Sequence, residues 1–294
     1  MSASESGRKE ARSVVLLLHC PLRSGLAASL TQFVYTHDGR IVYHEQYVDP
    51  EIGHYYTRLA WDVSTFAVSD EETAGLLRTL IGGEPETEWS LHYSDEVSRM
   101  AVFVSKDPSC LYDVLARSFS GEWTVEVPLV VGNHADLEPV AKRFGIAFRL
   151  FPVTKESKGE VEDEQLALLA SQRIDLVVLA RYMQILSGRF VEAYANRIIN
   201  IHHAFLPAFP GARPYHAARA RGVKMIGATS HYVTATLDAG PIIEQDVLRV
   251  THRHAVDDLV RFGRDLEKVV LSRAIGSHLR RKIIVHKGRT VVFD

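Results

Sequence analysis

Three polar side chains stand at the end of a hydrophobic run in the second half of the chain. Asn200, His202 and His203 follow Ile198 and flank Ile201. Because side chains alternate along a strand, Asn200 and His202 are expected on one face. An amide can hold a carbonyl oxygen, and an imidazole can donate or accept a proton near neutral pH. The pattern therefore predicts a site that stabilises negative charge developing on the oxygen of an attacked carbonyl group.

A carboxylate that this pair would need occurs downstream. Asp238 lies 36 residues after His202 (238 − 202) and begins the turn sequence Asp238-Ala239-Gly240-Pro241. It can orient His202 or tune its protonation. No Ser or Cys nucleophile accompanies these residues, so the attacking group is expected to be water or an amine of a substrate. The second-tier candidates for the same site are His231, Arg213 and His216.

Two other interpretations of these residues stay open. His202 and His203 could hold a metal ion, although adjacent strand residues face opposite ways and no third ligand stands at a recognised spacing such as HExxH. We therefore expect no metal site. Alternatively, Asn200 and His202 could serve only to satisfy backbone groups in a buried turn.

Length and composition limit the class of protein. The chain has 294 residues, of which 46% are hydrophobic and 24% charged, as in a soluble protein of two domains. Its net charge of -2 argues against nucleic-acid and membrane partners. Cys20 and Cys110 show no metal or disulfide spacing, and no apolar stretch reaches the roughly 18 residues of a membrane span. These features predict a cytoplasmic protein.

Residues 12–93 are expected to form a small α+β domain. Apolar patterns predict strands over 13–20, 40–48, 54–63 and 88–93, with helices over 26–37 and from the cap Ser69 to Gly82. This order is the ferredoxin-like split βαβ arrangement. The loop from Cys20 to Leu26 resembles that of ACT domains, although Leu22 stands where those domains usually have an acidic residue. The resemblance implies a homo-oligomer and a possible amino-acid effector; alternatively, the domain only holds subunits together.

Residues 98–294 have the pattern of a doubly wound domain with a mostly parallel sheet. Apolar runs over 100–105, 125–131, 147–151, 174–180 and 198–201 alternate with helical stretches. Ligands of such sheets bind beyond the carboxyl ends of the strands, where Asn200 and His202 stand. Further along, the sequence predicts a helix over 215–221, a strand over 225–233, a long helix capped by Thr251, and a hairpin over 282–293. The basic residues of that hairpin are expected to form a solvated edge.

The site motifs resemble a known family. Asn200-x-His202 with Leu206-Pro207, followed by Asp238-x-Gly240-Pro241-Ile242-Ile243-x-Gln245, is similar to the formyltransferases that use 10-formyltetrahydrofolate. The resemblance covers about residues 98–280 and implies that Asn200, His202 and Asp238 are the catalytic trio. It also implies a pterin-binding pocket built from two segments, which contain Tyr182, Met183, Gln184, Ile185 and Leu186, and Val233, Thr234 and Leu237.

Longer sequence segments resemble one particular group within this family. The segments 199–209, 211–216 and 222–229 resemble the formyltetrahydrofolate deformylases, which also carry an N-terminal ACT-like domain. The resemblance then covers nearly the whole chain. It implies hydrolysis of 10-formyltetrahydrofolate, as substrate rather than cofactor, to tetrahydrofolate and formate, with formate used in purine synthesis. No cofactor is expected.

The loop after the first strand of this domain bears on the choice of acceptor. Ser105 to Leu111 contains no glycine, and Pro108 has no N–H for a phosphate, which favours water over a phosphate-bearing amine. Ser109 stands where the deformylase pattern usually has His. Two alternatives stay open, namely formyl transfer to an amine acceptor and a catalytically silent folate or amino-acid sensor.

Overall fold

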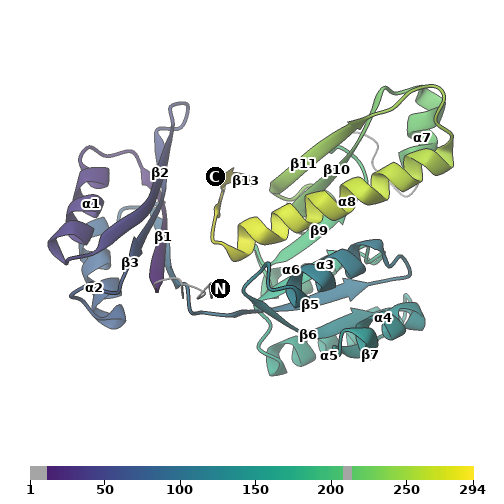
Figure 1. Cartoon of the computed structure of the whole chain (residues 1–294), viewed down its shortest axis with the longest axis horizontal. Helices are drawn as coiled ribbons and strands as arrows, with labels where there is room; N and C mark the ends of the chain where they lie inside the picture. Colours follow the sequence, from purple (N-terminus) through teal and green to yellow (C-terminus); the bar gives the residue numbers. More distant parts are fainter. Residues whose placement is uncertain (1–11, 208–213) are drawn as a thin grey trace, which may run out of the picture. The chain divides into compact units, whose positions relative to one another are not determined.

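The computed structural model describes residues 12–207 and 214–294 (Figure 1). The chain divides into two compact units. The first contains the residues up to Glu96 together with Phe293–Asp294, and the second is Val97–Val292. Asn200, His202 and Asp238 all belong to the second unit, so the site can be described within that unit alone.

The first unit is a four-stranded antiparallel sheet with two helices. Its strands have the order β2-β3-β1-β4, with β1 paired to both β3 and β4. Apolar residues of α1 and α2 pack with one face of the sheet, and Ser69 caps α2 through a capping box with Glu72. This is the predicted ferredoxin-like arrangement. Its elements are β1 (Ser13–Pro21), α1 (Leu26–Thr36), β2 (Arg40–Asp49), β3 (His54–Asp62), α2 (Asp70–Ile81) and β4 (Glu88–Tyr93).

A seven-stranded sheet of order β11-β10-β9-β8-β5-β6-β7 forms the centre of the second unit. The strands from β9 to β7 in this order run parallel, whereas β10 is antiparallel to β9 and to β11. The predicted mostly parallel sheet is therefore confirmed. The strands are β5 (Ser98–Val104), β6 (Val125–Gly132), β7 (Ala147–Leu150), β8 (Leu176–Ala180), β9 (Ile198–His202), β10 (Met225–Tyr232) and β11 (Ile242–Arg249); β12 (Ile283–His286) and β13 (Arg289–Val292) form the final hairpin.

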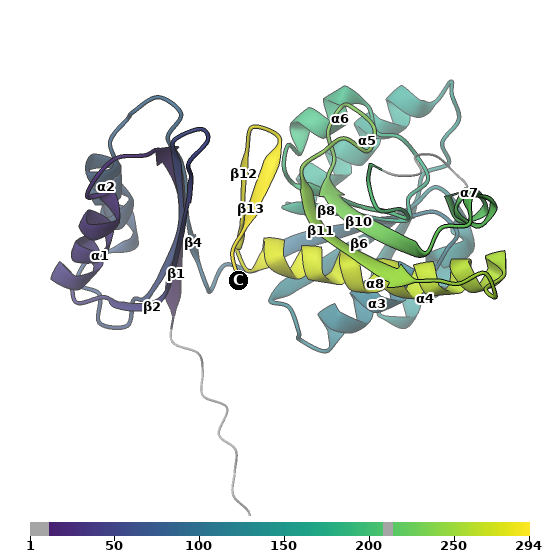
Figure 2. The ribbon, with the colours of Figure 1, turned by 90° about the horizontal axis from the view of Figure 1, so that it is seen from above.

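Helices cover both faces of this sheet. Apolar residues of α3, α4 and α8 pack on one face of the sheet, and those of α5 and α6 on the other. Figure 2 shows these two groups of helices on opposite sides of the strands. Strand β8 is buried along its whole length because it lies in the middle of these layers. The helices are α3 (Ser109–Phe119), α4 (Glu138–Arg143), α5 (Lys158–Ser171), α6 (Gly188–Ala193), α7 (Pro214–Arg221) and α8 (Val256–Leu279), with a 3-10 turn η1 (Ala135–Leu137) before α4.

Two details of the second unit differ from the prediction. Thr251 does not cap α8, which begins at Val256 after Ala255. There the Asp258 carboxylate accepts a hydrogen bond of 3.0 Å from the Ala255 backbone N–H, and this local contact fixes the start. Strand β11 was not predicted, because Glu244, Gln245 and Asp246 interrupt its apolar residues. Among the described residues, no helix combines the length and the apolar character needed to cross a membrane.

Candidate active site

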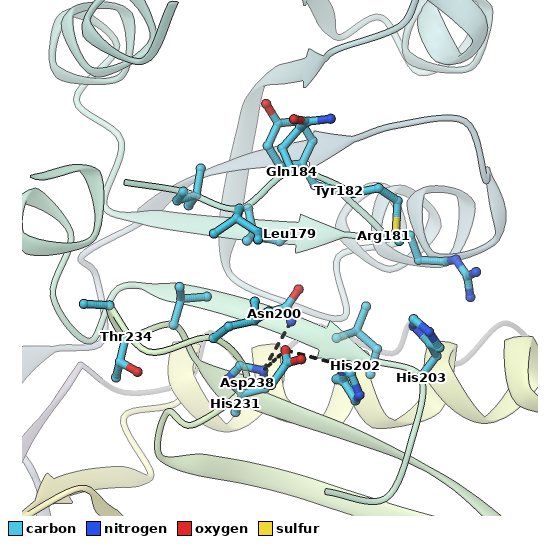
Figure 3. Close-up of a pocket in the computed structure, with 17 residues that line it drawn as sticks. Leu179, Arg181, Tyr182, Gln184, Asn200, His202, His203, His231, Thr234 and Asp238 are labelled. Atoms are coloured by element: carbon cyan, nitrogen blue, oxygen red, sulfur yellow. Dashed lines mark hydrogen bonds and ion pairs between the residues drawn. The ribbon is translucent and has the colours of Figure 1, made fainter. Parts of the chain in front are cut away.

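A cavity of about 280 Å³ opens beyond the carboxyl ends of β8 and β9 (Figure 3). Its lining combines the polar cluster with the two segments predicted to bind pterin. Every predicted site residue except two lies on it: Asn200, His202, His231 and Asp238, then Tyr182, Met183, Gln184, Ile185 and Leu186, then Val233, Thr234 and Leu237. His216 is exposed on α7 and is not part of this lining. Arg213 lies outside the described residues.

The pairing of β9 with β10 positions the first part of the cluster. In this antiparallel pair Asn200 stands directly opposite His231, so their side chains meet across the strands. Asn200 Nδ2 lies 3.2 Å from His231 Nε2. Sequence spacing suggested His231 only as a secondary candidate, because the register that brings it to Asn200 is a property of the folded sheet.

Hydrogen bonding sets the protonation of His231. Its Nδ1 lies 2.9 Å from the Tyr232 carbonyl oxygen, which can only accept, so Nδ1 carries the proton. Burial lowers the pKa of His231 below its ordinary value of 6.5. The ring is therefore neutral, and its bare Nε2 accepts a hydrogen bond from Asn200. One N–H of Asn200 is thus used, and the second is available to a ligand.

His202 and Asp238 form the other half of the cluster. His202 Nδ1 lies 3.3 Å from Asp238 Oδ1, and His231 Nε2 lies 3.8 Å from the same oxygen. Burial lowers the pKa of His202, although the nearby charge of Asp238 opposes this shift. His202 Nε2 is buried and has no hydrogen-bond partner within the described part of the chain. A neutral ring with its proton on Nδ1, donated to Asp238, leaves no buried N–H unpaired.

A tight loop between β10 and β11 presents Asp238. The Tyr232 N–H donates to the Pro241 carbonyl at 2.9 Å and closes the loop. A side chain at Gly240 would place its Cβ 1.7 Å from the Tyr232 carbonyl oxygen, so only glycine fits there. Asp238 itself has a φ of 54°, which turns its carboxylate toward the histidines.

The loop after His202 is held by side chains from the neighbouring strands. The Thr229 hydroxyl donates to the Ala204 carbonyl at 2.9 Å and accepts from the Leu206 N–H at 3.0 Å. Gln245 donates to the Leu206 carbonyl at 3.2 Å. The glutamine of the downstream motif therefore acts on the conformation of this loop. Leu206-Pro207 is a cis peptide bond.

The two adjacent histidines do not face opposite ways. Strand β9 ends at His202, and the rings of His202 and His203 stack with centroids 5.1 Å apart and an interplanar angle of 18°. The expectation of alternating faces was wrong at this point, because alternation ends with the strand.

Comparisons with known proteins agree with this geometry. Residues 98–275 match the formyl transferase family model. A formyltetrahydrofolate deformylase from Synechocystis is 50% identical over 96% of this chain and 98% of its own. A solved formyltetrahydrofolate deformylase from Pseudomonas syringae has a TM-score of 0.94 and 40% identity, over 97% of this chain and 96% of its own. This chain belongs to the formyltetrahydrofolate deformylase family. A glycinamide ribonucleotide transformylase from Symbiobacterium toebii has a TM-score of 0.65 and 32% identity, over 70% of this chain and 98% of its own.

The deformylase-family site also contains charged residues outside the predicted catalytic trio. Arg181 lines the cavity and pairs with Glu267 of α8, which is fully buried. Arg181 Nε also lies 3.6 Å from Asp107. The one sequence signal was a glutamate four residues after Gly263, at a core-facing position of the helix. Ser109 does not line the cavity; its hydroxyl donates to Asp107 at 2.6 Å.

Proposed function

We propose that this chain hydrolyses 10-formyltetrahydrofolate to tetrahydrofolate and formate, with Asn200, His202 and Asp238 as catalytic residues. Support comes from the deformylase family to which the chain belongs. The observation that carries the role of the site is the meeting of an amide, two neutral imidazoles and a carboxylate in a cavity whose other walls are mostly apolar.

The apolar walls suit a flat heteroaromatic ligand. Met183, Ile185 and Leu237 line the cavity yet are 57%, 59% and 62% exposed. Apolar side chains exposed around a concave surface gain free energy when a ligand covers them. Backbone groups of the same two segments can supply the hydrogen bonds that a pterin ring needs. We therefore place the folate between these segments, with its formyl group at Asn200.

The polar cluster supplies the groups for hydrolysis. Asn200 donates its second N–H to the formyl oxygen and stabilises the negative charge that develops there. The Asp238 carboxylate, partly accessible in the cavity, takes a proton from water as the water oxygen bonds to the formyl carbon. The bond from that carbon to N10 then breaks, and N10 receives the proton. The second proton of the water stays on the departing formic acid and is lost when the acid ionises, so the products are tetrahydrofolate, formate and one proton.

In this scheme His202 acts on Asp238. Its Nδ1–H donates to the carboxylate and keeps it turned toward the cavity. The accessible surface of Nε2 is negligible, which favours Asp238 over His202 as the group that contacts water.

The test is incubation of the purified chain with 10-formyltetrahydrofolate and no acceptor. We expect equal amounts of formate and tetrahydrofolate, measured separately. Release should disappear in Asn200→Ala and Asp238→Asn and persist in the control Asp163→Asn, which changes an exposed ion pair with Arg189. Loss of the formyl group only after an amine is added would contradict hydrolysis, and folate binding without turnover would indicate a sensor.

Several further features belong to the same proposal. Water as acceptor makes the enzyme a source of formate for purine synthesis and of free tetrahydrofolate. The protein is expected to act in the cytoplasm without a cofactor and as a homo-oligomer through its first unit. Leu22 is 53% exposed in the loop after β1, so an amino-acid effector there would lack the acidic partner common in ACT domains. Light scattering tests the oligomeric state, and calorimetric titration with amino acids tests whether an effector binds.

A further inference from the structure

A network of charged side chains borders the active site on the side of His202 and His203; Glu267 is fully buried, and Arg181 and Asp107 are partly buried. The first of these residues is Arg181, which directly follows β8. Arg181 has a φ of 59°, and this turns its side chain out of the strand direction. This conformation costs free energy for any residue with a Cβ, and glycine would adopt it without strain. Contacts of the side chain must therefore stabilise arginine in this position. The proposed hydrolysis assigns no role to it.

Glu267 is the first of these contacts. The Arg181 guanidinium donates through Nη1 to Glu267 Oε2, and the Tyr215 hydroxyl donates to Glu267 Oε1 at 2.7 Å. Tyr215 reaches the carboxylate because Gly263 leaves room for its ring; a Cβ there would lie 1.9 Å from the hydroxyl oxygen. Both carboxylate oxygens of this buried glutamate are thus occupied within the protein and are not free for a second substrate.

Asp107 is the second contact. One of its oxygens lies 3.6 Å from Arg181 Nε and 3.0 Å from Arg264 Nε, and the other accepts from the Ser109 hydroxyl at 2.6 Å. The loop that holds Asp107 is the one in which the sequence lacks glycines for a phosphate. Its carboxylate is therefore also committed to internal partners.

This network lies next to the reacting groups. The ring of His203 stacks on His202 and has its centroid 6.2 Å from that of Tyr215. Glu267 is close enough for its charge to raise the pKa of His202 against the larger lowering by burial. Figure 3 shows Arg181 and His203 at one end of the cavity and Thr234 at the other, with Asn200 and Asp238 between. A folate bound at the apolar end leaves the Arg181 end as the approach to the formyl carbon.

We propose that Arg181 selects water as the acceptor: held by Glu267 and Asp107, its side chain closes the approach through which an amine would reach the formyl carbon. The inference rests on the proposed hydrolysis. The fold alone does not choose the acceptor, because an enzyme named as a transformylase shares it. Water is small enough to pass beside the guanidinium, whereas an amine carrying further atoms needs the volume that the side chain fills.

The experiment measures partition between two acceptors. Arg181→Gly fits the backbone conformation and removes the side chain. Each protein is incubated with 10-formyltetrahydrofolate and glycinamide, and N-formylglycinamide and formate are quantified after subtraction of the reaction without enzyme. The amine product forms when the amine nitrogen bonds to the formyl carbon, the bond to N10 breaks, and the amine proton passes to N10. The product ratio does not depend on how much of the protein is folded.

A matched control is available in the same unit. Arg173 is also an arginine with positive φ, 50°, but it is exposed after α5 and does not line the cavity. Arg173→Gly should keep the unmodified ratio. Arg181→Gly should raise the ratio of formylated amine to formate at least about tenfold, since opening a pocket by several heavy atoms changes discrimination by that order. Arg181→Met, which keeps most of the bulk, should raise it less.

Each outcome is decisive. An unchanged ratio in Arg181→Gly with hydrolysis intact overturns the inference and leaves the proposed function standing. No formate from the unmodified protein overturns the proposed function itself. If Arg181→Gly has no activity, the double variant Arg181→Gly/Glu267→Gln is assayed next. It removes the charge of Glu267, which would otherwise be buried without its partner. Inactivity of that double variant beside an active Arg173→Gly would show that Arg181 is required for hydrolysis itself, which also overturns the inference.

Discussion

The two ends of the active-site cavity are built in opposite ways. At the folate end, Met183, Ile185 and Leu237 belong to loops and remain more than half exposed. At the reacting end, His202 and His231 are 6% and 2% exposed and belong to paired strands. The first end offers apolar area to a ligand, and the second fixes the direction of a few hydrogen bonds.

The two ends therefore have different functions: one binds the ligand, and the other stabilises the reacting groups. Loops can present apolar area without fixed geometry, because burial of such area is not directional. Hydrogen bonds to a developing charge are directional, so the groups that make them must be held by strands and by neighbouring side chains. Changes at the folate end should therefore alter KM, whereas changes at the reacting end should alter kcat.

The largest effect is expected from Asp238→Asn. The substitution keeps the shape of the side chain but removes the charge that accepts a proton from water. We expect kcat to fall by about 10³-fold or more, with folate affinity nearly unchanged. Single-turnover kinetics and equilibrium binding of a non-hydrolysable folate measure the two quantities. A near-normal rate would contradict the role of Asp238 as base.

His231→Phe should have a smaller effect on the same end. The variant cannot accept from Asn200, so the amide loses its fixed orientation while the strand pairing persists. We expect kcat to fall by about 10- to 100-fold, since one oriented donor is weakened rather than removed. His231→Gln, whose side-chain carbonyl can accept from Asn200, should recover part of the rate. Equal losses in both variants would show that His231 acts only in packing.

The pH profile tests the protonation of the histidines. Burial lowers the pKa of both His202 and His231 from 6.5, so both are neutral at pH 7. As pH falls through the lowered pKa values, a proton on His231 Nε2 removes the acceptor of Asn200. The rate should stay flat from pH 8 to 6.5 and then decline by about tenfold per pH unit for a single protonation. An acid limb centred above 6.5 would contradict a neutral pair.

Ile185→Ala should have the smallest effect and should act at the folate end. The variant removes apolar surface that the ligand would cover on one side only, worth about 1 kcal/mol. We expect KM to rise about fivefold with kcat unchanged. Phe119→Ala is the control, because this phenylalanine is 80% exposed on α3 and does not line the cavity. A fall in kcat without a change in KM would place Ile185 at the reacting end instead.

Much of the architecture was predictable because its signals are local. Apolar runs predicted the strands from β5 to β10, and apolar residues at helical spacing predicted both helices of the first unit. The pair Ser69 and Glu72 predicted the start of α2. Thr251 failed as a cap because another local contact, between Ala255 and Asp258, starts α8 later. Strand β11 was missed because three consecutive polar residues, 244–246, interrupt its apolar pattern.

The sequence alone determined which residue types gather at the site. Asn200, His202 and Asp238 could be named from motifs, since each lies where a strand or turn pattern ends, whereas the pterin segments followed from the resemblance to the formyltransferases. Which of these side chains contact one another, and in what orientation, depends on the tertiary structure. The β9–β10 register sets His231 against Asn200, and the close approach at Gly240 turns Asp238 toward His202. The packing of α8 brings Glu267 to Arg181, 86 positions apart in the chain, because burial forces two distant charges to pair.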